Sequence, residues 1–169
     1  MRSSDMAREH MPATSAVRVL REHHVEYTDH PYDYEPRGGT QVSARALGVD
    51  EHAVVKTLIM EDDRRRPMIV LMHGDREVST RKLARFLDVK HVAPCDPAVA
   101  DRHSGYQVGG TSPFGTRKAM PVYMERSIAG LPYLYVNGGR KGYLVGMAPA
   151  ELVRVLHPIA VDVATVGST

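Results

Sequence analysis

The chain has 169 residues, of which 43% are hydrophobic and 25% charged, an ordinary balance for one globular domain with its own core. Its formal net charge of +2 disfavours a protein that coats duplex DNA by charge alone. The single cysteine, Cys95, excludes an internal disulfide and fits a reducing cytoplasm, and no apolar run approaches the ~18 residues of a membrane span.

The N-terminal stretch is polar and lacks the apolar segment of a secretory signal. We predict a disordered leader over residues 1–12, a single domain over 13–160 and a loosely packed tail over 161–169. Apolar residues at 16–20, followed by polar ones, predict a short amphipathic helix, and a strand is expected around 25–28.

The middle of the chain alternates predicted helices and strands. Thr40 is expected to cap a helix that Gly48 closes. Residues 54–60 are dense in apolar and β-branched side chains and predict a buried strand, with 68–72 as its paired strand. Ser79 or Thr80 should cap the next helix, which has four apolar residues on one side: Leu83, Ala84, Phe86 and Leu87.

The second half continues the alternation. A short strand is expected over 90–93, and Asp96-Pro97 is a typical helix start. Three strands follow, over 121–124, 133–136 and 143–147, and Pro149 opens a last helix through Leu156. Because hairpin-like neighbours occur beside strand–helix alternation, we predict an α/β fold with a mixed sheet and peripheral helices.

The loop GGTSPFG at 109–115 combines three glycines, two hydroxyls and a proline. Glycine lets a ligand approach bare amides, and proline stiffens the turn. Such a loop can present N–H and O–H groups to a polar substrate, although a glycine pair alone is also typical of a tight structural turn.

Lys56 interrupts an otherwise apolar strand. Because side chains alternate along a strand, Lys56 and Leu58 should share one face while Val55 and Thr57 lie on the other. The lysine either extends its stem to an edge or places a partly desolvated ammonium in a cleft, where it would hold an anionic or carbonyl oxygen.

Other reactive residues lack the context of a known catalytic site. Cys95 reads as a small buried thiol, the histidines are scattered without zinc-ligand spacing, and the serines lack a hydrolase elbow. We therefore expect neither a metal nor a cofactor. The turn GGRKG at 138–142 is either a hairpin turn, a second wall of the site or a phosphate contact through Arg140 and Lys141.

Four motifs in this order resemble the YbaK family, the stand-alone relatives of the editing insertion domain of bacterial prolyl-tRNA synthetase. They are VKTL at 55–58, Asp96-Pro97, the segment 105–115 and YVNGG at 135–139. The resemblance covers roughly residues 16–156 and implies a mixed sheet curled towards a barrel. It also implies removal of a wrong amino acid from the 3′ end of a mischarged tRNA, with Cys-tRNA(Pro) as the expected substrate.

The resemblance assigns catalytic roles to Lys56, Gly109 and Gly110, whose amides would stabilise the oxyanion. The expected substrate-binding residues are Tyr32, Thr57, Thr111, Ser112, Pro113, Gly138 and Gly139. Leu144 and Gly146 stand where YbaK has acidic residues, so amino-acid specificity is open. Expected partners are the tRNA acceptor end and prolyl-tRNA synthetase, in the cytoplasm, with neither DNA nor a membrane. A non-catalytic module that binds charged tRNA or a nucleotide-like ligand is the alternative.

Overall fold

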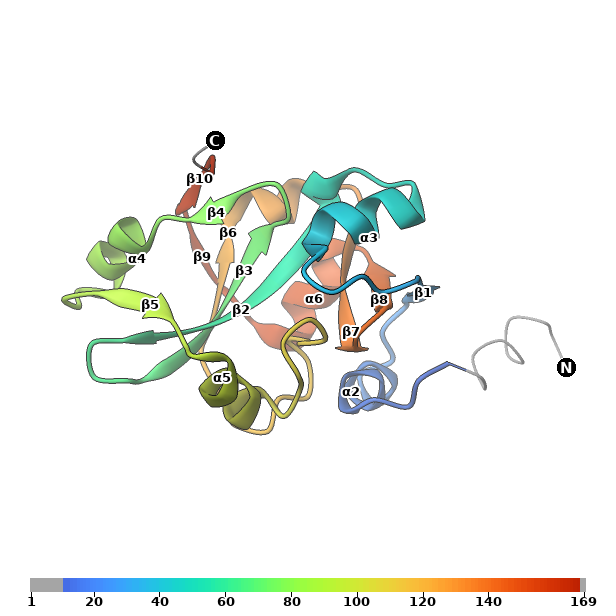
Figure 1. Ribbon diagram of the computed structural model, residues 1–169, viewed down its shortest axis with the longest axis horizontal. Coiled ribbons are helices and arrows are strands. Elements are labelled where there is room, and N and C mark those ends of the chain that lie inside the picture. Colours follow the sequence, from blue (N-terminus) through green and yellow to red (C-terminus); the bar gives the residue numbers. More distant parts are fainter. Residues whose placement is uncertain (1–10, 168–169) are drawn as a thin grey trace, which may run out of the picture.

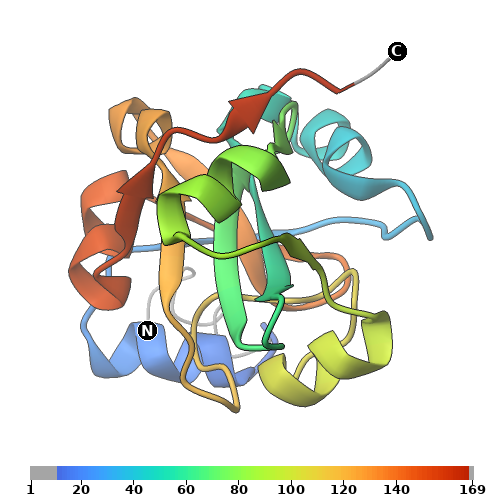
Figure 2. The ribbon, with the colours of Figure 1, turned by 90° about the vertical axis from the view of Figure 1, so that its left-hand side faces the viewer.

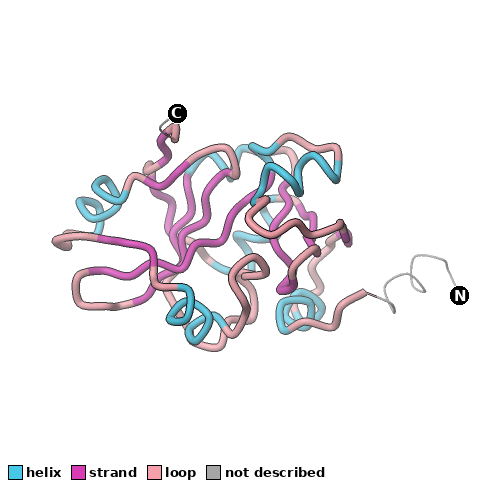
Figure 3. The backbone as a smooth tube through the Cα atoms, viewed as in Figure 1, coloured by secondary structure: helices cyan, strands magenta, loops and turns pink. Residues whose placement is uncertain are grey.

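The computed structural model describes residues 11–167, so most of the predicted leader and the last two residues lie outside the described part of the chain. One mixed sheet of eight strands forms the centre of the fold, and helices surround it (Figure 1 and Figure 3). The strand order is β1-β8-β7-β2-β3-β6-β9, and β5 also pairs with β2. This arrangement confirms the predicted mixed α/β class.

The strands of this sheet are β1 (Thr28–Pro31), β2 (Val54–Asp62), β3 (Pro67–His73), β5 (Val92–Pro94), β6 (Val122–Glu125), β7 (Leu134–Arg140), β8 (Tyr143–Met147) and β9 (Ile159–Val161). The helices are α2 (Ser15–Glu22), α3 (Gly39–Leu47), α4 (Thr80–Leu87), α5 (Pro97–Ser104) and α6 (Pro149–Leu156), with 3-10 turns η1 (Glu51–Ala53) and η2 (Arg126–Gly130). Ladders β2–β7, β3–β6 and β6–β9 are parallel, and the others are antiparallel.

The sheet is buried on both faces, which explains the unbroken apolar run of β3. Ile69 and Leu71 point into the larger core, which α2 and α6 close, while Val70 and Met72 point to a second cluster under α4. A strand covered on both sides needs apolar residues at consecutive positions. In Figure 2, α4 lies across the strands that it covers.

Three local predictions are wrong in detail. The first strand begins at Thr28, where pairing with β8 starts, and Val25 and Tyr27 pack into the core before it. Thr40 does not cap α3; its hydroxyl donates to the Glu51 carboxylate at 2.7 Å. Phe86 is 54% exposed and packs edge-on against Tyr123 at the margin of the apolar face of α4.

The prediction of a loosely packed tail is also wrong for the residues that the structure describes. Strand β9 pairs with β6, and β10 (Ala164–Thr165) pairs with β4 (Glu77–Val78) in a separate two-stranded sheet. The buried Glu125 carboxylate accepts the amides of Val163 and Ala164 at 2.7 and 3.0 Å. The alternation of Ile159, Val161 and Val163 is the strand pattern that indicates this packing.

His73 makes the fold sensitive to acid. Its buried ring donates from Nδ1 to the His52 carbonyl, accepts at Nε2 from the Ser127 hydroxyl, both at 2.7 Å, and stacks on the His52 ring. Burial lowers the pKa of His73, and the hydrogen bond to the His52 carbonyl, which favours the charged ring, offsets only part of that effect. The unfolded chain therefore takes up this proton at a higher pH than the folded one, so stability should fall as pH drops below about 6.5.

Urea unfolding at pH 7.5 and pH 5.5 measures this dependence, in a range above the titration of ordinary carboxylates. We expect a lower midpoint at pH 5.5 for the native chain and a smaller difference for His73→Gln, which cannot titrate. Equal pH dependence in both proteins would show that His73 is not the responsible group.

Candidate functional site

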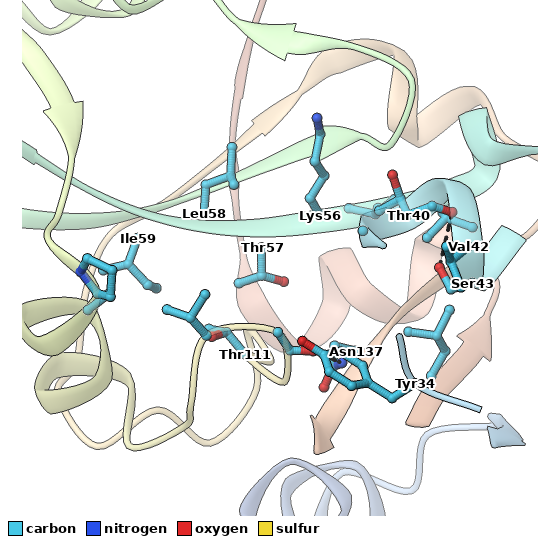
Figure 4. A pocket seen from close by; sticks show the side chains of 18 of the residues that line it. Tyr34, Thr40, Val42, Ser43, Lys56, Thr57, Leu58, Ile59, Thr111 and Asn137 are labelled. Carbon is cyan, nitrogen blue, oxygen red and sulfur yellow. Dashed lines mark hydrogen bonds between the residues drawn. The ribbon is translucent and has the colours of Figure 1, made fainter. Parts of the chain in front are cut away.

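A cavity of about 410 Å³ opens beside β2, bordered by α3, by the start of α5 and by the 109–115 loop (Figure 4). Its apolar side includes Ile59, Met60, Pro94 and Ala100. Its polar side includes Tyr34, Glu35, Thr40, Ser43, Lys56 and Asn137. The cavity thus joins an apolar recess to a set of hydrogen-bonding groups, the usual composition of a small-ligand site.

The cavity exists because the β2 edge is incompletely covered. Strand β7 pairs with β2 only at Val54 and Val55, and β5 pairs only from Met60 to Asp62. Ile59 accepts the amide of Cys95 across this edge, and backbone groups two residues apart point the same way, so the Thr57 amide and carbonyl point there too. No described strand pairs with Thr57 on this side, which leaves the edge open to a ligand.

The Thr57 side chain adds an unsatisfied hydroxyl. Its oxygen is buried and has no hydrogen-bond partner within the described residues. Figure 4 shows it on the side of β2 where Thr111 and Asn137 lie. A buried polar group without a partner costs about 1–3 kcal/mol, so this hydroxyl favours a ligand that hydrogen-bonds to it.

Lys56 and Leu58 project from the opposite side of β2, as the predicted alternation requires (Figure 4). Lys56 is half-buried and lines the cavity, and it forms no ion pair within residues 11–167. Burial lowers the pKa of Lys56, whereas nearby Glu77, Glu51 and Asp75 counteract that effect. Lys56 is thus a partly desolvated cation among the lining residues, on the opposite side of β2 from the Thr57 hydroxyl.

Only part of the 109–115 loop reaches the cavity. Gly109 and Thr111 line it, and the Gly109 amide has no partner among the described residues. The Gly110 amide already donates to the Gln107 carbonyl at 2.8 Å, so its expected oxyanion role is not supported by this geometry. Gly110 instead packs against the backbone of the 138–142 turn.

Ser112 and Pro113 lie behind the cavity wall rather than in it. Both are buried, and the Ser112 hydroxyl accepts the Phe114 amide at 3.2 Å. The fully buried Phe114 ring anchors the loop in the core. These residues therefore shape the loop, and the structure does not place them in contact with a ligand in the cavity.

The second glycine turn also acts through a neighbour. Gly138 and Gly139 do not line the cavity, but Asn137 does. The Asn137 side chain accepts the amides of Gly139 and Arg140 and donates to the Gly109 carbonyl at 3.4 Å. Asn137 therefore couples the two glycine-rich turns. It is part of the YVNGG motif, but we did not predict this role for it.

Residues before and within α3 supply the wall that sequence reasoning missed. Tyr32 lines the cavity as predicted, and burial raises its pKa. Tyr34 lies across Gly109, with the Lys141 ammonium 5.5 Å from its ring centre. Thr40 and Ser43 complete this side. In the sequence, the feature that could have indicated this wall is the cluster of tyrosines and glycines around the start of α3.

Leu144 and Gly146 of β8, the two positions that leave the amino-acid specificity open, have distinct environments. Leu144 lines the cavity and packs with Ala44 and Val54. Gly146 leaves room for neighbouring side chains, since an added Cβ would lie 2.6 Å from the Tyr133 ring and 2.7 Å from the Thr28 hydroxyl. Of these two positions, only Leu144 contributes to the cavity wall, and that part of the wall is apolar.

Cys95 lines the apolar end of the cavity, and burial raises its pKa to about 11. The thiol is therefore protonated near neutral pH and is a poor nucleophile. No described set of three or more His, Cys, Asp or Glu residues is placed to hold a metal ion. Within the same residues, no helix is both long and apolar enough to cross a membrane.

These features define an α/β domain with a partly apolar cavity that offers a cation, an unpartnered hydroxyl and open backbone groups to a polar ligand. The model of the aminoacyl-tRNA editing domain matches residues 35–155. The chain belongs to this family.

Similar proteins agree with this membership. A protein of Enterococcus faecalis assigned as a Cys-tRNA(Pro)/Cys-tRNA(Cys) deacylase, EbsC, is 24% identical over 90% of this chain and 93% of its own. A proline–tRNA ligase of Fervidobacterium nodosum is 32% identical over 111 residues, which are 65% of this chain and 19% of the ligase. The chain thus corresponds to about a fifth of such a ligase.

Solved structures show the same fold. A hypothetical protein superposes with a TM-score of 0.82 at 22% identity, covering 90% of this chain and all of the other. A crystal structure described as a trans-editing enzyme for prolyl-tRNA synthetase gives 0.78 at 21% identity, covering 92% of this chain and 99% of that one. The predicted YbaK-like architecture is confirmed.

Proposed function

We propose that the protein is an aminoacyl-tRNA deacylase that clears mischarged tRNA in trans, with Cys-tRNA(Pro) as its substrate. The observation that carries the proposal is the unpartnered Thr57 hydroxyl on an uncovered strand edge, in the same cavity as Lys56 and Gly109. Family membership and the relative assigned as a Cys-tRNA deacylase support it. The reaction would take place in the cytoplasm, where tRNA is charged.

The cavity suits an ester that needs positioning more than a protein nucleophile. The amide of Gly109 and the amide and hydroxyl of Thr57 would donate to the oxygen that becomes negative as the carbonyl is attacked. Lys56 would neutralise charge on the substrate, and the aminoacyl side chain would enter the recess beside Ile59. Tyr32 and Thr111 would complete the contact surface.

For a cysteinyl ester, the substrate can supply its own nucleophile. Its thiol sulfur attacks the carbonyl carbon, the ester C–O bond breaks, and the thiol proton passes to the released ribose oxygen. The products are a cyclic thiolactone and free tRNA. Holding the sulfur against the carbonyl is then the main contribution of the protein, and such orientation can be a large effect.

A panel of mischarged tRNAs tests the function. The purified protein should release cysteine from Cys-tRNA(Pro) faster than it releases alanine from Ala-tRNA(Pro), and should leave Pro-tRNA(Pro) intact. No release from any substrate, under conditions where a prolyl-tRNA synthetase editing domain is active, would disprove deacylation. Tight binding of Cys-tRNA(Pro) without release would instead identify a non-catalytic binding module. The apolar cavity wall at Leu144 is compatible with that alternative.

Thr57→Val tests the carrying observation directly. Valine keeps the shape of threonine but removes the hydroxyl, so kcat/KM should fall by about tenfold or more, as for one lost hydrogen bond. The unfolding free energy should not fall, because the hydroxyl has no partner in the described structure. Thr165→Val, in β10, is the matched control and should keep full activity. An undiminished rate for Thr57→Val would remove the hydroxyl from the mechanism.

A further inference from the structure

A second cavity lies at one end of the molecule, away from the site described above. It measures about 420 Å³ and lies between α4 and the segment that leads into β5. Its lining includes Thr80, Arg81, Arg85, Val89, Lys90 and His91. In Figures 1 and 2, α4, β5 and the turn between β2 and β3 lie together at this end.

Positive charge is concentrated around this cleft. Residues 80–91 contain four Lys or Arg side chains and one acidic residue, Asp88, whereas the whole chain has a net charge of only +2. Arg81, Arg85 and Lys90 form no ion pair within the described residues. The cleft is therefore a local cationic site on a nearly neutral protein.

The helix dipole favours Arg85, in the last turn of α4, but two other features of these cations oppose the stability of the helix. The first turn of the helix has no acidic residue and carries Arg81 and Lys82, where the helix dipole disfavours positive charge. Arg81 and Arg85 are four residues apart, so their like charges face each other along the helix. An anion bound in the cleft would relieve both unfavourable interactions.

The neighbouring turn extends the basic surface. Arg64 and Arg65 are exposed between β2 and β3. Asp63, beside them, accepts the backbone amide of Lys90 at 3.1 Å and so fixes this turn against the cleft segment. Several cations from separate segments can thus contact one extended anion.

The cleft and the first cavity are connected by β5. Lys90 and His91 line the cleft, and Pro94 and Cys95 line the cavity. Five residues of extended chain span at most about 17 Å, a distance of a few nucleotides along one RNA strand. For a nucleic acid whose 3′ end enters the cavity, the cleft is therefore within reach of the phosphates nearest that end.

We propose that this cleft binds the sugar-phosphate backbone of the tRNA whose aminoacyl end occupies the first cavity. The inference rests on the proposed function for its substrate. It identifies a surface, outside the aminoacyl cavity, that anchors the tRNA by charge and carries no base or amino-acid specificity.

The test compares the double variant Arg81→Ala/Arg85→Ala with the matched control Arg18→Ala/Arg21→Ala. The control removes two exposed arginines from α2, which lies at the other end of the molecule (Figure 1). The substrates are Cys-tRNA(Pro) and a cysteinyl ester of adenosine, which has no phosphodiester. For the cleft variant, the ratio of kcat/KM on tRNA to that on the ester should fall about tenfold, through KM.

Binding of uncharged tRNA(Pro), followed by fluorescence anisotropy at several salt concentrations, gives a readout without turnover. The plot of log K against log salt falls with a negative slope, and each lost phosphate contact should make that slope shallower by about 0.7–0.9. Weaker tRNA binding by the cleft variant supports the inference even if the protein releases no amino acid. Absence of release would disprove only the deacylase function. Deacylation and binding equal to those of the control would overturn it, as would a variant that loses binding to anionic lipid vesicles but not to tRNA.

Discussion

Replacing Lys56 by alanine should reduce kcat/KM for deacylation of Cys-tRNA(Pro) by about 10²–10³-fold, the usual loss for one group that stabilises charge in a transition state. Lys56 is the half-buried cation of the first cavity, and no described carboxylate forms an ion pair with it. Its free ammonium is thus available to the substrate. Release of cysteine from the labelled tRNA under single-turnover conditions measures the chemical step.

The same change should not unfold the protein. Truncation removes a partly desolvated charge from beside Leu58, and burial lowers the pKa of this lysine, so the folded state gains little from it. The midpoint temperature of thermal unfolding should therefore be close to that of the native protein. Lys118→Ala, at an exposed loop position, is the control and should leave the rate unchanged. If Lys56→Ala retained more than a tenth of the native rate, the charge would not be part of the mechanism.

Comparison of a short side chain with a long uncharged one at position 56 should also separate positioning from charge. Lys56→Met keeps the length of the stem without the ammonium, so it should be as slow as the alanine variant if charge is what matters. Recovery of activity in the methionine variant alone would show that Lys56 acts by packing against the cavity wall.

The sequence predicts elements whose determinants are local. Ser79 accepts the Lys82 amide as the cap of α4, and Pro97 opens α5 after Asp96. The pleat places Lys56 and Thr57 on opposite sides of β2, as the alternation rule requires. Each of these features depends on residues within a few positions of one another, which is why pattern reasoning finds them.

The parts that pattern reasoning missed depend on contacts between distant segments. Asn137 joins the two glycine turns across 28 residues, and Tyr34 lies over Gly109. The open edge at Thr57 arises because β7 and β5 cover different ends of β2. None of these follows from local spacing, since each requires knowledge of which strands are neighbours.

Gly110→Ala should lower both stability and activity, although Gly110 does not line the cavity. An added Cβ would lie 2.7 Å from the backbone nitrogen of Lys141 and 2.9 Å from the carbonyl carbon of Arg140. Both contacts are backbone atoms, so neither can move aside as a flexible side chain would. The two glycine-rich turns must separate, and overpacking of this kind costs about 1–3 kcal/mol.

The activity loss should exceed what the stability loss explains. Gly109 follows the movement of Gly110, and Asn137 holds the Gly109 carbonyl from the other turn, so separation displaces the donor groups of the cavity. A shift of about 1 Å in a positioned group can cost 10²-fold in rate. Single-turnover rates, measured well below the unfolding temperature of the variant, isolate this effect from unfolding.

Gly130→Ala is the matched control, because a Cβ there meets no atom within 4 Å. It should leave the urea midpoint and the rate close to those of the native protein. A Gly110→Ala protein that behaved like this control would show that the two turns tolerate separation, and the coupling through Asn137 would then have no role in positioning the substrate.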